Sequence, residues 1–151
     1  ESSVTALIEN KSGDAYDSAM IFCALARNAK IPCIPVSGIY VDSNMEAHNH
    51  WWNEFYIQDF GWIPVDVALG AGLEYLNYTP EDNSKDYYFG NLDSQHVMFS
   101  RGWNKIKSSH INGNVVYRPK TYALQSIWEE ASTDIQAYSS FWSNVYVTGV
   151  Y

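Results

Sequence analysis

The stretch HWWNEFYIQDFGWIPVD, residues 50–66, decides the fold. Segments 50–57 and 61–68 are rich in aromatic and β-branched residues, which predicts two strands. The few residues between them run into Gly61, so the connection is predicted to be a tight hairpin rather than a crossover. The core of the protein is therefore expected to be an antiparallel sheet. Further strands are predicted at 34–41, 96–100 and 114–120.

A long apolar segment precedes these strands. From Asp14 to about Ala29, apolar residues fall on nearly every side of a helix in its second half, which is typical of a buried helix. Asp14 is the expected N-cap, with Asp17 near the positive end of the helix. The proline of KIP (30–32) predicts the end of the helix, because the residue before a proline avoids the helical region. A polar loop is predicted at 70–85 and another helix at 122–137.

Length and composition limit the class of protein. The 151 residues are expected to form a single α+β domain, 1–151, with the buried helix packed on the antiparallel sheet. A formal net charge of −8 argues against a nucleic-acid partner. The apolar runs are shorter than the roughly 20 residues that a membrane span needs. Richness in Tyr, Asn and Ser favours an extracytoplasmic or secreted protein. Two cysteines make neither a disulfide framework nor a zinc site.

The residue that decides the chemistry is Ala15. A cysteine there would lie at the positive end of a buried helix, which favours the nucleophilic thiolate. His50 at the start of one strand and Asp66 near the end of the next could supply a base and its orienting carboxylate. They share a face of the sheet only if the paired residue numbers sum to an even value, for instance 57 opposite 61. A two-residue turn would place them on opposite faces.

Three motifs resemble the transglutaminase-like superfamily. GDAYDSAMIFCALARNAKIP (13–32) resembles the G-x-C helix of that superfamily, followed by R-x-x-G-I-P. HWWNEFYIQDFGWIPVD resembles its His strand, H-x-W-x-E, and its Asp strand, G-W-x-x-x-D. YFGNLDSQHVMFSRG (88–102) is similar to a segment that follows the Asp strand in bacterial members. The resemblance covers about residues 11–102, in the family's order of nucleophile, His and Asp.

The resemblance implies a papain-like fold and acyl-transfer chemistry. The substrate would be a protein or peptide, attacked at a glutamine or peptide amide by transglutamination, proteolysis or deamidation, and no cofactor or metal is expected. The resemblance assigns the nucleophile position to Ala15, the base to His50 and the orienting carboxylate to Asp66. Trp52 and Trp62 are expected to belong to the core or to the wall of a substrate-binding groove.

The sequence departs from the family pattern at several positions. Because a methyl group can neither attack a carbonyl nor form a thioester, Ala15 predicts a chain without covalent catalysis, either an engineered Cys→Ala mutant or a natural pseudoenzyme. Lys30 stands where the family usually has glycine. Fourteen residues precede position 15, so upstream parts of the family core are expected to be missing. Cys23, inside the helix, and Cys33, beyond it, are not expected to replace the nucleophile.

Two other classes of function remain open. The first is a non-catalytic module that binds peptide or glycan in an aromatic groove of the same fold. The second is a cupin-like metal protein: HNHWWNE (48–54) would place His48, His50 and Glu54 on one face of a strand as ligands. Against it, no glycine lies six residues before His48, and no second cupin motif follows. If the protein is not cupin-like, His48, His96 and His110 are expected to be surface residues or to have their hydrogen bonds satisfied.

Overall fold

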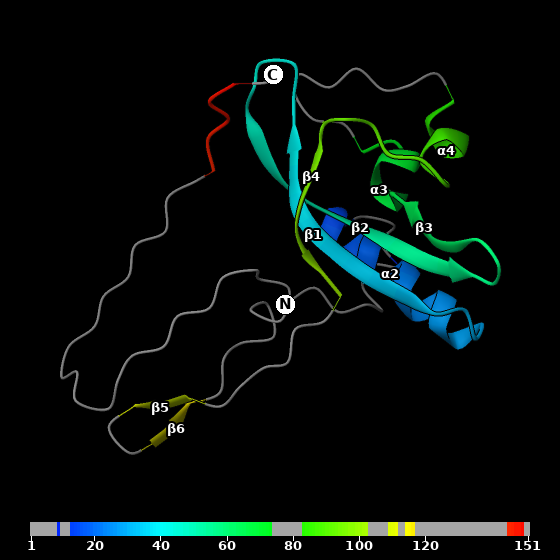
Figure 1. The fold of residues 1–151 in the computed structure, drawn as a ribbon, viewed down its shortest axis with the longest axis horizontal. Coiled ribbons are helices and arrows are strands. Elements are labelled where there is room, and N and C mark those ends of the chain that lie inside the picture. Colours follow the sequence, from blue (N-terminus) through cyan, green and yellow to red (C-terminus); the bar gives the residue numbers. More distant parts are fainter. Residues whose placement is uncertain are drawn as a thin grey trace.

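A computed structural model describes residues 9, 13–73, 83–102, 109–111, 114–116 and 145–149. Four antiparallel strands form its main sheet, in the order β3-β2-β1-β4 (Figure 1). The strands are β1 (Cys33–Val41), β2 (Ala47–Ile57), β3 (Gly61–Val65) and β4 (His96–Arg101). The described helices are α2 (Ala15–Asn28), α3 (Val67–Gly70) and α4 (Ser84–Tyr87). A two-stranded ladder pairs β5 (Ser109–Ile111) with β6 (Asn114–Val116).

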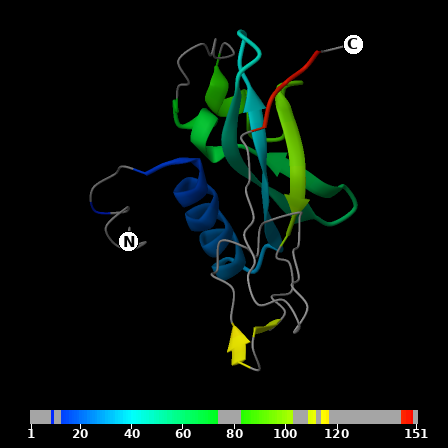
Figure 2. The same ribbon diagram turned by 90° about the vertical axis from the view of Figure 1, so that its left-hand side faces the viewer.

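Helix α2 lies along one face of the sheet (Figure 2). Its start agrees with the sequence: Asp14 Oδ1 accepts from the backbone N–H of Asp17 at 2.9 Å, and Asp17 Oδ2 accepts from that of Asp14 at 3.3 Å. This reciprocal capping box confirms the predicted N-cap. The helix is less buried than predicted, because Leu25 is 61% exposed. The buried stripe consists of Ala15, Ala19 and Cys23.

Lys30 lies at the end of α2, at the position where the family usually has glycine. This residue has a φ of 66°, in the left-handed region that glycine adopts most easily. Its N–H donates to the carbonyl of Arg27 at 3.0 Å, and the N–H of Ile31 donates to that of Ala26 at 2.9 Å. Such bonds close a helix around a left-handed residue. The backbone therefore favours a glycine at the position where the family resemblance expected one.

The β2–β3 hairpin has the register that the proposed site requires. Ile57 pairs with Gly61, which leaves a three-residue connection, and Gly61 takes a φ of 95°. The paired numbers therefore sum to an even value, as the proposed site requires. The strand was predicted to extend to residue 68, but β3 ends at Val65. The reason is that Asp66 caps α3 and accepts from the backbone N–H of Leu69 at 3.0 Å.

The remaining predictions of secondary structure are met in part. Strand β4 confirms the strand predicted at 96–100 and is one residue longer. The loop predicted at 70–85 is interrupted by the start of α4, while residues 74–82 lie outside the described residues. Only 114–116 of the strand predicted at 114–120 is described, as β6. The helix predicted at 122–137 lies outside the described residues, and β5 was not predicted.

Two apolar clusters flank the sheet. Cys23 of α2 packs with Cys33, Phe55 and Val65 from three strands of the sheet. A second cluster joins Tyr40 of β1 to Leu69 of α3 and Tyr88, which follows α4. The first cluster fixes α2 on the sheet, and the second fixes the segment that begins at Asp66. None of the described helices combines the length and apolarity needed to cross a membrane.

Candidate active site

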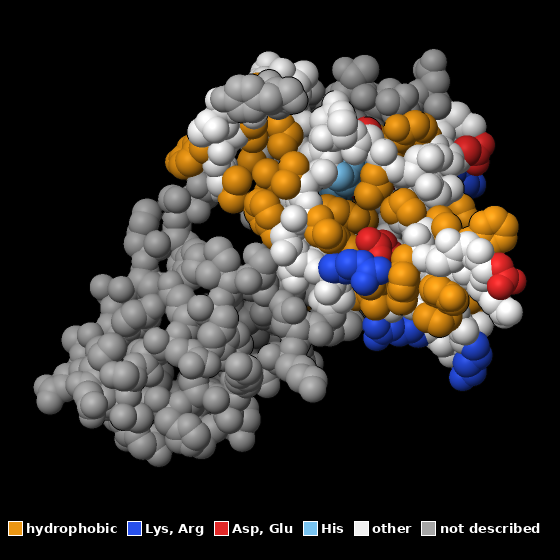
Figure 3. All heavy atoms as spheres, viewed as in Figure 1, with side chains coloured by type: hydrophobic (Ala, Val, Ile, Leu, Met, Phe, Trp, Pro, Cys, Tyr) orange, Lys and Arg blue, Asp and Glu red, His pale blue; other side chains and the backbone are white. Residues whose placement is uncertain are grey.

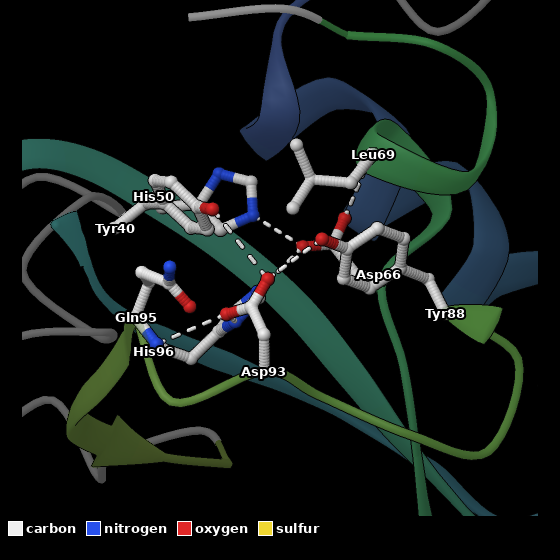
Figure 4. Close-up of polar contacts among 8 residues, drawn as sticks. All are labelled: Tyr40, His50, Asp66, Leu69, Tyr88, Asp93, Gln95 and His96. Carbon is white, nitrogen blue, oxygen red and sulfur yellow. Dashed lines mark hydrogen bonds and ion pairs between the residues drawn. The ribbon is translucent and has the colours of Figure 1, made fainter. Parts of the chain in front are cut away.

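His50 and Asp66 meet in the interior of the protein. His50 lies on β2 and is 0% exposed, and Asp66 follows β3. His50 Nε2 donates a hydrogen bond to Asp66 Oδ2 (Figure 4). The second oxygen, Oδ1, holds the backbone N–H of Leu69. The contact that strand parity predicted is therefore present, and the carboxylate is fixed through both of its oxygens.

A second histidine shares the same carboxylate. His96, the first residue of β4, approaches Asp66 Oδ2 with Nε2 at 2.9 Å and Asp93 Oδ1 with Nδ1 at 2.7 Å (Figure 4). His96 was expected to be a surface or satisfied residue; it is satisfied, but inside the site. The available signal was the D-x-x-H spacing of Asp93 and His96 in the segment 88–102, which alone does not locate them beside Asp66.

Asp93 is held by groups from several elements. Its Oδ2 accepts from the hydroxyl of Tyr88 at 2.6 Å and lies 3.5 Å from that of Tyr40. Its Oδ1 accepts from the backbone N–H of Gln95 at 3.0 Å and faces His96. Asp93 therefore anchors His96 from the side opposite Asp66.

The electrostatics of the site favour charged Asp66 and His96. Burial alone would raise the pKa of Asp66, but the hydrogen bonds with His50 and His96 lower it to about 2. Burial alone would lower the pKa of His96, but its bonds to Asp66 and Asp93 raise it to about 9. Burial also opposes ionisation of Asp93, yet its bonds with His96 and Tyr88 lower the pKa of that carboxyl.

The two predicted substrate-binding tryptophans have different surroundings. Trp52 is 3% exposed; its ring stacks on that of His50, with centroids 6.1 Å apart, and meets His96 edge-on at 5.2 Å. Trp62 is 40% exposed, with the guanidinium of Arg101 5.1 Å from its ring centroid. Figure 3 shows hydrophobic side chains spread over this view of the molecule, with histidine surface visible among them. Trp52 thus supports the histidines, and Trp62 is the one of the two that reaches solvent.

Ala15 is the first residue of α2 and is 3% exposed. Three contacts set how α2 lies along β2. The ring of Tyr16 meets that of Trp51 at 5.7 Å, the Ala19 carbonyl accepts from Asn53 Nδ2 at 2.9 Å, and Phe22 meets Phe55 at 6.3 Å. Helix and strand therefore advance together, so the start of α2 lies level with Trp51. Trp51, Asn53 and Phe55 alternate along β2 with His50 and Trp52, which share the other face of the strand. Helix α2 also contacts α3, which begins directly after Asp66.

The two cysteines lie elsewhere on α2 and β1. Both are buried and belong to the apolar cluster between helix and sheet. The thiol of Cys23 lies 3.3 Å from the backbone carbonyl of Cys33, to which it donates. Arg27 Nε donates to the same carbonyl at 2.8 Å. These hydrogen bonds join Cys23, Arg27 and Cys33 to one another and do not involve His50 or Asp66. Both cysteines therefore have the surroundings of structural thiols.

The cupin-like ligand set is not assembled. His48 Nε2 lies 3.0 Å from Asp42 Oδ2, and Glu54 accepts from Arg101 Nε at 2.7 Å. Within the described part of the chain, two other groups could hold a metal ion, His50 with Asp66 and His96, and Asp42 with Glu46 and His48. In the first group both Nε2 atoms face one carboxylate oxygen. A nitrogen that donates its proton there has no lone pair to offer a metal.

Comparison with known proteins finds a similarity to one family over the first part of the chain. Residues 1–67 match the family model of the transglutaminase-like superfamily. The matched segment includes Ala15, His50 and Asp66, whereas Asp93 and His96 lie beyond it. The observed α+β arrangement, a helix on a four-stranded antiparallel sheet, is consistent with a transglutaminase-like core.

A curated relative adds little about activity. An uncharacterized protein of Haemophilus influenzae is 29% identical to the chain over 114 aligned residues. The alignment covers 58% of this chain and 31% of the relative, so the chain spans less than a third of that protein's length. No solved structure matches the chain.

Proposed function

We propose that the transglutaminase-like domain carries the site of a cysteine-type acyl transferase or peptidase in which Ala15 occupies the nucleophile's position. The observation that supports this most strongly is the buried hydrogen bond from His50 Nε2 to Asp66 Oδ2. A carboxylate that fixes one ring nitrogen leaves the other to exchange a proton with a nucleophile. In this proposal the chain with Ala15 keeps the base and its orienting carboxylate but performs no covalent catalysis.

The position of Ala15 supports the assignment of the nucleophile. Helix α2 begins with a capping box at Asp14 and Asp17, so its first turn is well ordered and its positive end is fixed. A thiol at the first position of such a helix is stabilised as thiolate. The aligned contacts between α2 and β2 bring this end of the helix beside the strand that carries His50.

The reaction of the Ala15→Cys variant follows from this arrangement. His50 Nδ1 would take the thiol proton, and the thiolate would attack the carbonyl carbon of a glutamine or peptide amide. His50 would then return the proton to the departing amine, leaving an acyl group on the sulfur. Water or a second amine would release that acyl group and regenerate the thiol. Asp66 would keep the imidazole oriented throughout without taking up the proton.

An electrophilic cysteine probe tests this assignment. The Ala15→Cys variant is treated with iodoacetamide, and modification of each cysteine is followed by peptide mass spectrometry. We expect labelling at position 15 to exceed that at Cys23 and Cys33 by roughly 100-fold or more, because an activated thiolate reacts faster than buried thiols. The additional change His50→Gln should remove most of that advantage.

The controls separate reactivity from exposure. His48→Gln makes the same chemical change on the same strand, outside the proposed pair, and should leave labelling at position 15 within about twofold. Circular dichroism and thermal unfolding establish that each variant folds. Labelling at position 15 that is no faster than at Cys23, or that is indifferent to His50→Gln, would refute the proposed function.

A further inference from the structure

The ring of His96 has a carboxylate at each of its nitrogens. Nδ1 lies 2.7 Å from Asp93 Oδ1, and Nε2 lies 2.9 Å from Asp66 Oδ2. A neutral imidazole carries one N–H and can satisfy only one of these acceptors, whereas an imidazolium satisfies both. The side chain is 2% exposed, so water does not substitute for either partner. The contacts themselves therefore require a protonated, positively charged His96.

This cation stands next to the candidate base. The ring centroids of His50 and His96 are 5.4 Å apart, and both Nε2 atoms approach the same oxygen of Asp66. One imidazolium thus lies between two carboxylates and offsets part of the negative charge of Asp66. A second positive charge on His50 would be repelled by His96 at this distance and would share a carboxylate that is already paired.

We propose that His96 is a positioning residue that acts through Asp66 and keeps His50 in its neutral, proton-accepting form. Asp93 holds His96 in its charged state, and His96 occupies part of the hydrogen-bonding capacity of Asp66 Oδ2. The value of this arrangement for catalysis rests on the proposed function, because only a base needs His50 unprotonated. The charge relation between the two histidines can be measured in the chain with Ala15.

A purely structural role for His96 is the competing explanation. His96 begins β4 and links that edge strand to the β2–β3 hairpin through Asp66, so its loss would also loosen packing. The titratable groups around it come from five places in the chain. They are Tyr40 on β1, His50 on β2, Asp66 after β3, Tyr88 after α4, and Asp93.

The experiment is an NMR titration of the histidine side chains in the chain with Ala15. Ring signals are assigned by comparing the spectra of single His→Gln variants. In the His96→Gln variant an amide can still donate to Asp66, but the positive charge is gone. We expect the pH at which His50 takes up its second proton to rise by about one unit or more, because the repulsion from His96 has been removed.

Two further variants separate charge from packing. His96→Lys returns a cation to the two carboxylates and should move the His50 midpoint back toward that of the unmodified chain. His48→Gln removes a histidine from the contact with Asp42 and should leave the His50 midpoint unchanged. Thermal unfolding of each variant reports the loss of packing independently.

The outcomes are distinct. A His50 midpoint that rises in His96→Gln and returns in His96→Lys supports the proposal, even if the Ala15→Cys variant proves unreactive. A midpoint that is the same in the unmodified chain and in His96→Gln overturns it, even if that variant is less stable. An equal rise in His96→Gln and His96→Lys also overturns it, because packing and not charge would then be responsible.

Discussion

The side-chain amide of Asn53 donates a 2.9 Å hydrogen bond to the backbone carbonyl of Ala19. This bond ties the middle of β2 to the second turn of α2, in a place where both residues are buried. The bond fixes the position of the helix along the length of the strand. The hydrogen bond thereby holds α2 against the strand that carries His50.

Removing this bond should loosen the helix from the sheet. We expect Asn53→Ala to lower the free energy of unfolding by about 1–2 kcal/mol, because a buried hydrogen bond and its packing are lost. Asn49→Ala, at an exposed position of the same strand, should change it by less than about 0.5 kcal/mol. Urea denaturation measures both. Equal effects of the two changes would contradict the anchoring role of Asn53.

Stability should depend on pH through the shared carboxylate. Folding raises the pKa of His96 from 6.5 to about 9 against the effect of burial, because of Asp66 and Asp93. This contribution is complete below pH 6.5 and is lost as the pH rises through about 9, up to about 3 kcal/mol in all. Urea midpoints at pH 6, 7.5 and 9 measure the loss. His96→Gln should flatten this alkaline decline; an unchanged slope would contradict the assigned ion pairs.

Low pH should also reduce the stability of the protein, because it protonates Asp66 in the same site. The pKa of Asp66 falls from 3.8 to about 2 on folding, against burial, because of the bonds with His50 and His96. The resulting stability is present above pH 3.8 and is lost as the pH falls toward 2. In Asp66→Asn this acid-dependent loss should be reduced. Asp59→Asn, at an exposed carboxylate between β2 and β3, serves as the control and should leave the acid-dependent loss unchanged.

Lys30 offers a stabilising substitution. Because its φ is 66°, we expect Lys30→Gly to raise the free energy of unfolding by roughly 0.5–1 kcal/mol, the strain relieved minus the greater entropy of the unfolded glycine. Lys85→Gly, inside α4, should have the opposite sign because glycine weakens a helix. Thermal unfolding of both variants checks the prediction. A loss of stability in Lys30→Gly would contradict the backbone described for the end of α2.

Gly38 allows β1 and β4 to approach closely. A Cβ atom at this position would lie 2.0 Å from the backbone carbonyl oxygen of Val97, next to the irregularity in strand pairing at Ser37. We expect Gly38→Ala to cost about 2–4 kcal/mol, because backbone and not a flexible side chain must move. Gly70→Ala meets its nearest atoms at 3.8 Å and should be neutral or slightly stabilising. Similar denaturation midpoints for the two variants would exclude this close approach.

Local sequence patterns were sufficient for one part of the candidate site. The pairing of His50 with Asp66 follows from the parity of two adjacent strands and the length of one turn, all within seventeen consecutive residues. The capping box at Asp14 was likewise readable, because a cap depends on neighbours three residues away.

The part that sequence reasoning missed depends on contacts between distant residues. His96 reaches Asp66 only because β4 pairs with β1, where His96 stands opposite Tyr40, and β1 in turn pairs with the His50 strand. No periodicity within the segment 88–102 specifies which strand it will join. The exposure of Leu25 was missed for a related reason, since an apolar side chain does not by itself reveal which face of a helix is covered.

The central claim is that Ala15 faces the His50–Asp66 pair, and an NMR measurement on the unmodified chain tests it most directly. Nuclear Overhauser contacts from the Ala15 methyl group report protons within about 5 Å. We predict contacts between this methyl group and the ring protons of His50. If the methyl group shows contacts to other residues of α2 and none to the His50 ring, Ala15 does not occupy the nucleophile's position.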